Sequence, residues 1–503
     1  MCRQLKKGGT AYIIFVHNRY CDMLIITPFA YVFCMQRAFL FYIRLRILYK
    51  INNNKNNIGM SRKKDKVKGI VFGKKTGKLY YSPTDAEGHV VCFAGSGLGK
   101  TSSILIPTLQ HWDGTCYVVD ISGDICQNVA VPNKIIFNPD DMNGALYNIF
   151  FPVDMFENDA DKNEALEQLA FQLMPLETNM TDTSVFFLTE GRKILTAAMI
   201  TYYHQGMDFP QICKRIISSS WSTLFSEIDQ NGNYEAKQYI NSFEGTNEKN
   251  IAGCKQACDS ALKLFATNSH VYNAIGRERE GKEAFTPEQL ENKNIFVVIQ
   301  DSKLELYESL VHIITAQCME YFSNRDNNNQ HTILMCLDEF ASFGHLEITP
   351  ALRKLRKKHV RIMVLTQSLA DIDLIYGRDE RMAMLNNFAY KIVLGCSDSD
   401  TQEYFSRLIG EKEVYRKAVS KNGKQVTNTR TEAKERIVPP AELARLGRHM
   451  ILLAEGKYYK LTKNYYFELD LWDRVKKCIN NLSRIQEEDF SEKNTLSLTD
   501  ENK

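Results

Sequence analysis

The chain has 503 residues, of which 44% are hydrophobic and 24% are charged. This composition is typical of a globular protein with several domains, and it argues against a disordered chain or a protein that crosses the membrane many times. The net charge of only +3 creates no overall positive field, so any contact with nucleic acid would need a local basic patch or channel.

The first 59 residues differ in composition from the rest, with nine Lys or Arg and a single acidic residue, Asp22. An apolar run over residues 23–43 is long enough to span a bilayer, but a proline, a glutamine and Arg37 interrupt it. Three interpretations remain open. The segment is a poor membrane anchor, it lies upstream of a true start at Met60, or it is an amphipathic segment that binds a surface.

A phosphate-binding loop is the strongest motif. Residues 90–93 predict a strand, and Ala94-Gly-Ser-Gly-Leu-Gly-Lys-Thr101 follows before a predicted helix. This is the GxxxxGK[ST] pattern with Ala at its first position. Its glycines let backbone N–H groups point at phosphates, Lys100 reaches the β- and γ-phosphates, and the Thr101 hydroxyl binds Mg²⁺. We expect ATP and Mg²⁺ to bind to Gly95, Ser96, Gly97, Leu98, Gly99, Lys100 and Thr101.

Residues 115–120 predict a second strand that ends in Asp120. An Asp at this place either lies at the active edge of an α/β sheet or is a solvated residue of the following turn, and both readings stay open.

The segment 157–290 is predicted to be an inserted all-helical domain. Helical periodicity covers residues 159–174, 186–202 and 251–275, and strand signals are few. Within the last of these, Cys254 and Cys258 are expected to be buried small residues rather than metal ligands. The 13 cysteines of the chain form no Cys-x-x-Cys pair, which fits reduced thiols. A strand over residues 294–300 and a helix over 310–322 then return to the sheet.

Two acidic residues follow the next apolar strand, residues 332–337. Such a run without alternation is typical of a strand buried on both faces of a parallel sheet. Asp338 is expected to hold Mg²⁺, and Glu339 to act as the base that polarises the attacking water. The strand over residues 360–366 ends in Gln367, which is placed to sense the γ-phosphate.

A basic helix end, residues 352–359, lies between these two strands. One reading is a solvated helix C-terminus whose charges complement the helix dipole. The other is an arginine finger, with Arg356 as the best candidate, that reaches the ATP of a neighbouring subunit.

Taken together, these motifs resemble the TraG/TraD-like coupling proteins of type IV secretion and plasmid conjugation. The resemblance covers about residues 61–470 and is specific in the core but loose in the helical insertion. Beside the phosphate loop, it rests on Val118-Val-Asp-Ile-Ser-Gly-Asp124, Leu337-Asp-Glu-Phe-Ala-Ser-Phe-Gly344, Leu365-Thr-Gln-Ser-Leu369 and Ile437-Val-Pro-Pro-Ala-Glu-Leu443. Ser122 and Asp124 stand where the family commonly has Lys and Glu.

The resemblance implies an α/β fold: a RecA-like P-loop NTPase with a mostly parallel central sheet and an inserted all-α domain. It implies a homo-hexameric ATPase that binds DNA without sequence preference, recruits a relaxase–DNA complex and pumps DNA toward a type IV secretion channel. It also implies a soluble body at the cytoplasmic face of the bacterial inner membrane, and a trans-acting arginine at the position of Arg356. Family members usually carry two N-terminal membrane helices.

The expected domain organisation follows from these motifs. Residues 1–59 are the uncertain N-terminal segment, 60–156 and 291–478 form the nucleotide-binding domain, and 157–290 form the insertion. Residues 479–503 are polar and acidic and are expected to be disordered. An alternative function is a nucleotide-switched adaptor that recruits protein substrates to the channel without pumping DNA.

Overall fold

The computed structural model describes residues 12–14, 24–26, 69–83, 88–176, 180–279, 282–422 and 425–468. The chain divides into two units, Met1–Asp65 and Lys66–Lys503. In the first, β1 (Tyr12–Ile14) pairs antiparallel with β2 (Leu24–Ile26). The other expectations for the first 59 residues, and those for the tail after residue 478, fall outside the described residues. No helix in the described part is both long and apolar enough to cross a membrane.

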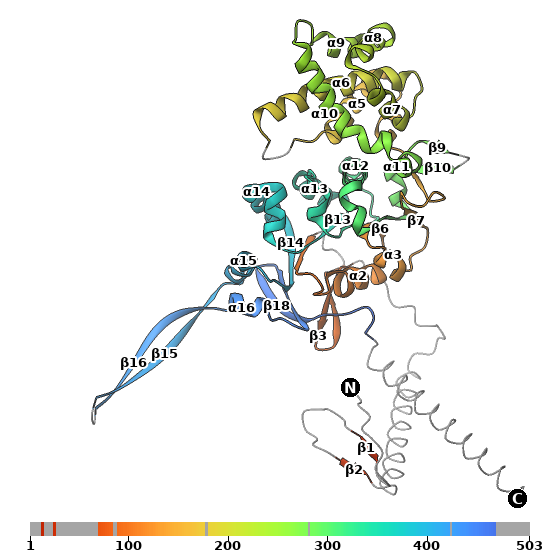
Figure 1. Ribbon diagram of the computed structural model, residues 1–503. Coiled ribbons are helices and arrows are strands. Elements are labelled where there is room, and N and C mark those ends of the chain that lie inside the picture. Colours follow the sequence, from red (N-terminus) through yellow and green to blue (C-terminus); the bar gives the residue numbers. More distant parts are fainter. Residues whose placement is uncertain are drawn as a thin grey trace, which may run out of the picture. The chain divides into compact units, whose positions relative to one another are not determined.

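The described part of the second unit is built on a sheet of 11 strands (Figure 1). A parallel stretch runs in the order β14 (Phe388–Gly395), β5 (His89–Ala94), β13 (Val360–Thr366), β12 (Ile333–Leu337), β6 (Thr115–Ile121), β11 (Asn294–Ile299) and β7 (Lys134–Phe137). Antiparallel strands continue beyond β14 as β17 (His449–Ala454), β18 (Lys457–Thr462), β3 (Val71–Lys75) and β4 (Lys78–Tyr81). The predicted α/β class with a mostly parallel sheet is confirmed.

The central strands are buried on both faces. β5, β6, β12 and β13 are buried at every position, because the alternating side chains of each strand enter two different cores. On β5, Val91 and Phe93 face one core, whereas Val90 and Cys92 face the other.

Helices cover both faces of the sheet. The core on one side includes residues of α12 (Leu304–Ser323), α13 (Ile348–Leu355), α14 (Leu369–Asn386) and α15 (Ser399–Ile409). The opposite core includes residues of α2 (Ile106–His111) and α3 (Asp124–Asn128). A π-helical turn, η1 (Thr101–Leu105), opens the helix after the phosphate loop.

The segment 157–290 is mostly helical, but the prediction of an all-helical domain is wrong at its end, where β9 (Glu278–Arg279) and β10 (Lys282–Phe285) form strands. After α4 (Phe151–Asp154), it contains α5 (Asp159–Leu173), α6 (Asp182–His204), α7 (Phe209–Ser218), α8 (Trp221–Asn231), α9 (Tyr234–Asn241), α10 (Glu248–Thr267) and α11 (Ser269–Ala274). In Figure 1, α5 to α10 gather on the side of α12 and α13 that faces away from the sheet. Cys254 and Cys258 are buried in α10.

Two details of this segment differ from the prediction. The expected single helix over residues 251–275 is interrupted at Asn268, because the Asn268 side chain accepts hydrogen bonds from the first N–H groups of α11 and so begins a new helix. Phe186, expected on the apolar face, is 44% exposed. It lies near the start of α6, whose buried positions begin at Gly191.

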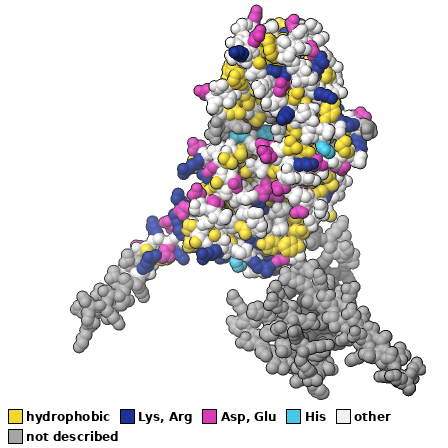
Figure 2. All heavy atoms as spheres, viewed as in Figure 1, with side chains coloured by type: hydrophobic (Ala, Val, Ile, Leu, Met, Phe, Trp, Pro, Cys, Tyr) yellow, Lys and Arg dark blue, Asp and Glu magenta, His cyan; other side chains and the backbone are white. Residues whose placement is uncertain are grey.

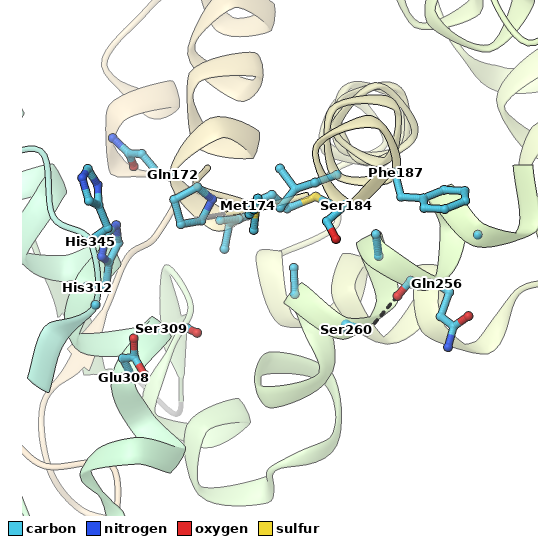
Figure 3. Close-up of a pocket in the computed structure, with 18 residues that line it drawn as sticks. Gln172, Met174, Ser184, Phe187, Gln256, Ser260, Glu308, Ser309, His312 and His345 are labelled. Carbon is cyan, nitrogen blue, oxygen red and sulfur yellow. Dashed lines mark hydrogen bonds between the residues drawn. The ribbon is translucent and has the colours of Figure 1, made fainter. Parts of the chain in front are cut away.

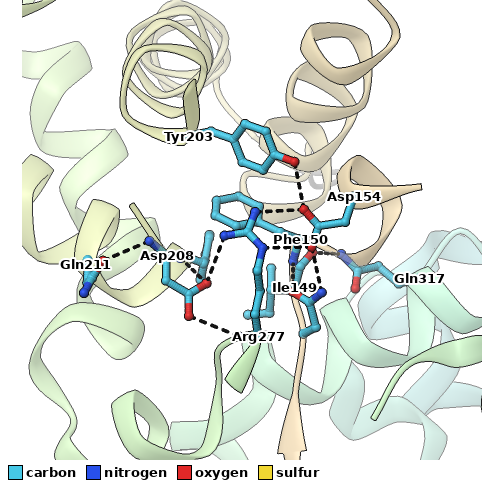
Figure 4. A network of polar contacts seen from close by, with 10 residues as sticks. Ile149, Phe150, Asp154, Tyr203, Asp208, Gln211, Arg277 and Gln317 are labelled. Atoms are coloured by element: carbon cyan, nitrogen blue, oxygen red, sulfur yellow. Dashed lines mark hydrogen bonds and ion pairs between the residues drawn. The ribbon is translucent and has the colours of Figure 1, made fainter. Parts of the chain in front are cut away.

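The insertion is fastened where it leaves and rejoins the sheet domain (Figure 4). Arg277 donates hydrogen bonds to both carboxylate oxygens of Asp154, at 2.9 and 2.8 Å, and Asp208 lies 3.7 Å from its guanidinium. The guanidinium also lies over the rings of Phe150 and Tyr203, at 5.1 and 5.0 Å. Next to this network, β8 (Leu146–Tyr147) pairs parallel with β10 (Lys282–Phe285), which also pairs with β9 (Glu278–Arg279).

A long hairpin was not predicted from the sequence. β15 (Glu411–Asn422) pairs only with β16 (Gln425–Arg436) among the described strands. At its base, Arg436 forms ion pairs with Glu403 of α15 and with Glu411. Figure 2 shows Lys, Arg, Asp and Glu side chains mixed on this face, where the hairpin leaves the sheet.

Candidate nucleotide-binding site

Three neighbouring strands deliver the candidate site residues to one edge of the sheet. The phosphate loop follows β5, Gln367 follows β13, and Asp338 and Glu339 follow β12. β13 pairs in parallel with both β5 and β12, so all three strands end on the same side. Residues far apart in the sequence meet there because the carboxyl ends of parallel strands share one edge.

The phosphate loop is anchored at its start and open in its middle. The Gly95 N–H donates to the carbonyl of Gly395 at 3.1 Å, which ties the loop to β14. Gly97 and Gly99 have φ of 71° and 92°, a region where an L side chain is strained. Nothing lies within 4 Å of where a Cβ on Gly97 would be. The loop therefore combines a fixed start with an open backbone surface, as a phosphate cradle requires.

Lys100 and Glu339 form an ion pair at the centre of the site. Lys100 is 7% exposed, and its ammonium donates a hydrogen bond to Glu339 Oε1 at 2.8 Å. Gln367 Nε2 donates to the other carboxylate oxygen, Oε2, at 3.3 Å. Glu339 thus links the predicted phosphate-binding lysine to the predicted γ-phosphate sensor.

The Glu339 backbone adopts an unusual conformation. Its φ and ψ are 50° and 49°, a left-handed geometry that costs a non-glycine residue roughly 1–2 kcal/mol. The chain turns there from the end of β12 into η4 (Phe340–Phe343). The strain is stored at the residue whose carboxylate contacts Lys100, as is common at functional sites.

Thr101 and Asp338 supply oxygen ligands of the kind that Mg²⁺ prefers. The Thr101 hydroxyl donates to Asp338 Oδ2 at 3.0 Å. Asp338 is 5% exposed, and burial, together with the nearby Glu339 charge, raises its pKa to about 6. A raised carboxylate pKa means that the protein neighbours compensate its charge poorly. The pair therefore fits a divalent cation, whose charge would favour the ionised carboxylate.

Arg356 lies away from this cluster. It begins η5 (Arg356–Lys358), the turn that precedes β13, and is exposed, whereas the phosphate loop lies beyond the opposite ends of the strands. Burial, with added repulsion from the Arg356 and Arg361 charges, lowers the pKa of His89, the first residue of β5, to about 4. Arg356 is therefore near His89 at the far edge of the sheet and does not join Lys100 of its own chain.

The Asp120 carboxylate binds the N-terminal turn of α3. Its carboxylate accepts hydrogen bonds from the N–H groups of Ile125 and Cys126, at 3.3 and 2.6 Å, in the first turn of α3. The side chain is fully buried, so the reading as a solvated turn residue is wrong. Asp120 satisfies helix N–H groups that would otherwise lack a partner.

The structure adds contacts to the site that sequence reasoning missed. Lys463, directly after β18, donates to the carbonyl of Leu98 at 2.9 Å, and the Tyr466 N–H donates to the carbonyl of Ser102 at 3.0 Å. Neither residue belongs to a recognisable motif. Only the run of aromatic residues at 465–467 could have drawn attention to this segment.

A separate cavity of about 740 Å³ lies between the insertion and α12 (Figure 3). Met174, Ser184 and Gln256 line it from the insertion, and His312 and His345 line it from the sheet domain. Burial lowers the pKa of His312. The phosphate-loop residues do not line this cavity, so it is distinct from the candidate nucleotide site.

Known proteins share the sequence pattern. A family model described as type IV secretory system conjugative DNA transfer matches residues 49–493. Protein VirD4 of Rhizobium rhizogenes is 22% identical over 379 residues, which cover 70% of this chain and 54% of that protein. The chain thus spans about half the length of the curated relatives it matches.

Solved structures of a bacterial conjugative coupling protein, TrwB, share the fold. The unbound form of TrwBdeltaN70 has a TM-score of 0.64 at 20% identity, covering 82% of this chain and 96% of that chain. TrwB in complex with ADP and Mg²⁺ has a TM-score of 0.62 at 18% identity, covering 83% and 98%. The likeness confirms the predicted RecA-like P-loop fold with a helical domain.

Proposed function

The chain belongs to the family described as type IV secretory system conjugative DNA transfer, and on this premise we propose that it is an ATP-driven coupling protein. It recruits a relaxase–DNA complex and pumps DNA toward a type IV secretion channel. The observation that carries this proposal is the meeting of Lys100, Thr101, Asp338 and Glu339 at one edge of the sheet. That arrangement has the parts needed to bind and hydrolyse a nucleoside triphosphate.

Each residue has a role that follows from its contacts. Bound Mg²⁺ would supply the positive charge that neutralises the phosphates and activates the γ-phosphoryl group. Thr101 and Asp338 would hold it. Lys100 exchanges the Glu339 carboxylate for phosphate oxygens when nucleotide binds. The released Glu339 then orients a water molecule and accepts its proton.

Gln367 couples the chemistry to movement. Its amide already contacts Glu339, and it directly precedes Ser368, the N-cap of α14. A change at the γ-phosphate position shifts this contact and therefore the adjoining helix. Arg356, at the opposite edge, is suited to act on the ATP of a neighbouring subunit in a homo-hexameric ring.

The remaining assignments follow from the family. The protein contacts DNA through phosphates and without sequence preference, so its affinity falls as salt rises. It works at the cytoplasmic face of the bacterial inner membrane, next to the secretion channel.

The test is ATP hydrolysis by the full chain with no DNA, with single-stranded DNA and with double-stranded DNA. We expect DNA to raise turnover several-fold and Lys100→Ala to abolish it. A folded protein that binds ATP but hydrolyses it at the same rate with and without DNA would contradict pumping and favour the adaptor function. A protein that binds no nucleotide would contradict both.

A further inference from the structure

The last described segment, residues 463–468, lies against the phosphate loop. It follows β18, the last strand of the sheet. Its contacts come from both side chain and backbone: Lys463 to Leu98, and Tyr466 to Ser102. We call residues 463–468 the C-terminal strap. The strap brings the end of the nucleotide-binding domain to the place where the triphosphate is expected.

Lys463 is a buried cation without a carboxylate partner among the described residues. It is 2% exposed, and its ammonium donates its one hydrogen bond there to the Leu98 carbonyl. Burial lowers its pKa. A buried ammonium with a single neutral partner is unfavourable unless negative charge comes close. Its position against the loop suits a site that an anionic ligand completes.

Tyr465 lies directly against Gly99. A Cβ built on Gly99 would approach Tyr465 Cε1 to 2.8 Å, so the ring touches the residue before Lys100. Tyr465 also stacks on Phe467, with ring centroids 5.3 Å apart and an angle of 27° between the planes. Phe467 is 62% exposed. The two rings are thus a stacked aromatic pair at the boundary between the phosphate loop and solvent.

From this juxtaposition we propose that Tyr465, supported by Phe467, forms the surface on which the nucleobase stacks. The inference rests on the proposed function and extends it to the part of the site that recognises the nucleoside. Aromatic rings bind any base through its flat face. The surface therefore serves any nucleobase without requiring a hydrogen bond to it.

The location favours a base over other ligands. The phosphates are expected to accept hydrogen bonds from the loop N–H groups as far as Thr101. The strap contacts the next residue, because the Tyr466 N–H donates to the Ser102 carbonyl. The γ-phosphate is expected toward Glu339 and Gln367, so the nucleoside leaves the phosphates at the Ser102 end of the loop. An aromatic pair at that end is placed for stacking.

The experiment compares two ligands by titration calorimetry on the full chain with Mg²⁺: ADP, which has a base, and inorganic tripolyphosphate, which has none. We expect Tyr465→Ala to raise the Kd for ADP about tenfold, which corresponds to about 1.4 kcal/mol. The Kd for tripolyphosphate should stay within about twofold. Tyr465→Phe should bind both ligands as the wild type does, because it keeps the ring.

Tyr458→Ala is the matched control, because Tyr458 is a 41% exposed tyrosine on β18, outside the strap. Equal or tighter binding of ADP by Tyr465→Ala would overturn the inference while leaving the proposed function intact. Equal weakening of both ligands would also overturn it, since Tyr465 would then support the loop and not the base. Failure of the wild type to bind either ligand would overturn the proposed function itself.

Discussion

The Lys100 ammonium and Oε1 of the Glu339 carboxylate lie 2.8 Å apart, so the lysine proposed to bind phosphate is paired with the group proposed as the catalytic base. A phosphate oxygen and the Glu339 carboxylate therefore compete for one ammonium. In the proposed mechanism, nucleotide binding breaks this ion pair and frees Glu339 to orient the water molecule.

This competition predicts opposite effects on binding and turnover in Glu339→Gln. The amide removes the charge that holds Lys100, so nucleotide affinity should rise by about fivefold, the value of an ion pair worth about 1 kcal/mol. Hydrolysis should fall roughly 100-fold or more, because the proton acceptor is lost. Calorimetry and a phosphate-release assay measure the two quantities. Glu347→Gln, which changes an exposed acid between η4 and α13, is the control, and weaker binding by Glu339→Gln would contradict the competition.

A second prediction concerns stability and pH. The pKa of Asp338 is raised to about 6, so the folded state binds this proton more tightly than the unfolded state, whose Asp titrates near 4. Between about pH 4 and 6 the unfolded chain has lost the proton and the folded chain has kept it, so this residue makes stability fall as pH rises. Above pH 6 the ionised Asp338 lowers the free energy of unfolding by its full amount, about 2–3 kcal/mol.

Asp338→Asn removes this penalty. In the absence of Mg²⁺ and nucleotide, the variant should unfold at a higher temperature than the wild type at pH 7.5, and the difference should shrink toward pH 4. It should also lose the stabilisation that Mg²⁺–ADP gives the wild type. Thermal unfolding monitored by circular dichroism gives both results, with the exposed Asp379 changed to Asn as the control. A lower unfolding temperature at pH 7.5 would show that the buried charge is well compensated.

The position of Arg356 predicts complementation between two inactive variants. Lys100→Ala lacks a working phosphate loop, and Arg356→Ala lacks the arginine that would serve a neighbour. In an equal mixture that assembles at random, about a quarter of the subunit interfaces join an intact loop to an intact arginine. ATPase activity should therefore reappear on mixing. Arg353→Ala, an exposed arginine of α13, should be active alone, and a mixture as inactive as its components would reject the trans role.

The junction of the helical insertion gives a prediction about local stability. Arg277→Met keeps the aliphatic stem but removes the guanidinium from Asp154, Asp208 and the two aromatic rings. The local free energy of opening around this half-exposed network should fall by about 2 kcal/mol. Amide hydrogen exchange should therefore become faster in α4 and in the strands β8 and β10. Arg407→Met, which breaks an exposed ion pair with Glu403, should change exchange little.

The parts of the fold that could be predicted are those with a distinctive local sequence, such as an apolar run or the phosphate-loop motif. The apolar runs 90–93, 332–337 and 360–366 could be predicted as strands, and the lack of polar alternation in 332–337 also indicated a strand buried on both faces of a parallel sheet. The phosphate loop and the Asp338–Glu339 pair could be placed together because parallel strands end at one edge.

The elements that were missed depend on distant contacts. The polar sequence of the β15–β16 hairpin has no regular alternation of apolar residues to reveal it. Among the described strands, β15 and β16 pair only with each other. Lys463 looks like any surface lysine in the sequence, and only the pairing of β18 within the sheet brings it to Leu98. The left-handed turn at Glu339 is likewise set by the surrounding sheet and helices, since the residue itself disfavours it.

The ion pair between Asp154 and Arg277 also affects how such a protein can change during evolution. The chain departs into the insertion and comes back at almost the same point, with β8 and β10 side by side. Residues 155–276 can therefore be lengthened, shortened or rewritten without altering the register of any strand in the large sheet. Selection can act on the insertion while the sheet domain is inherited unchanged, which accounts for a family resemblance that is specific in the core and loose in the helices.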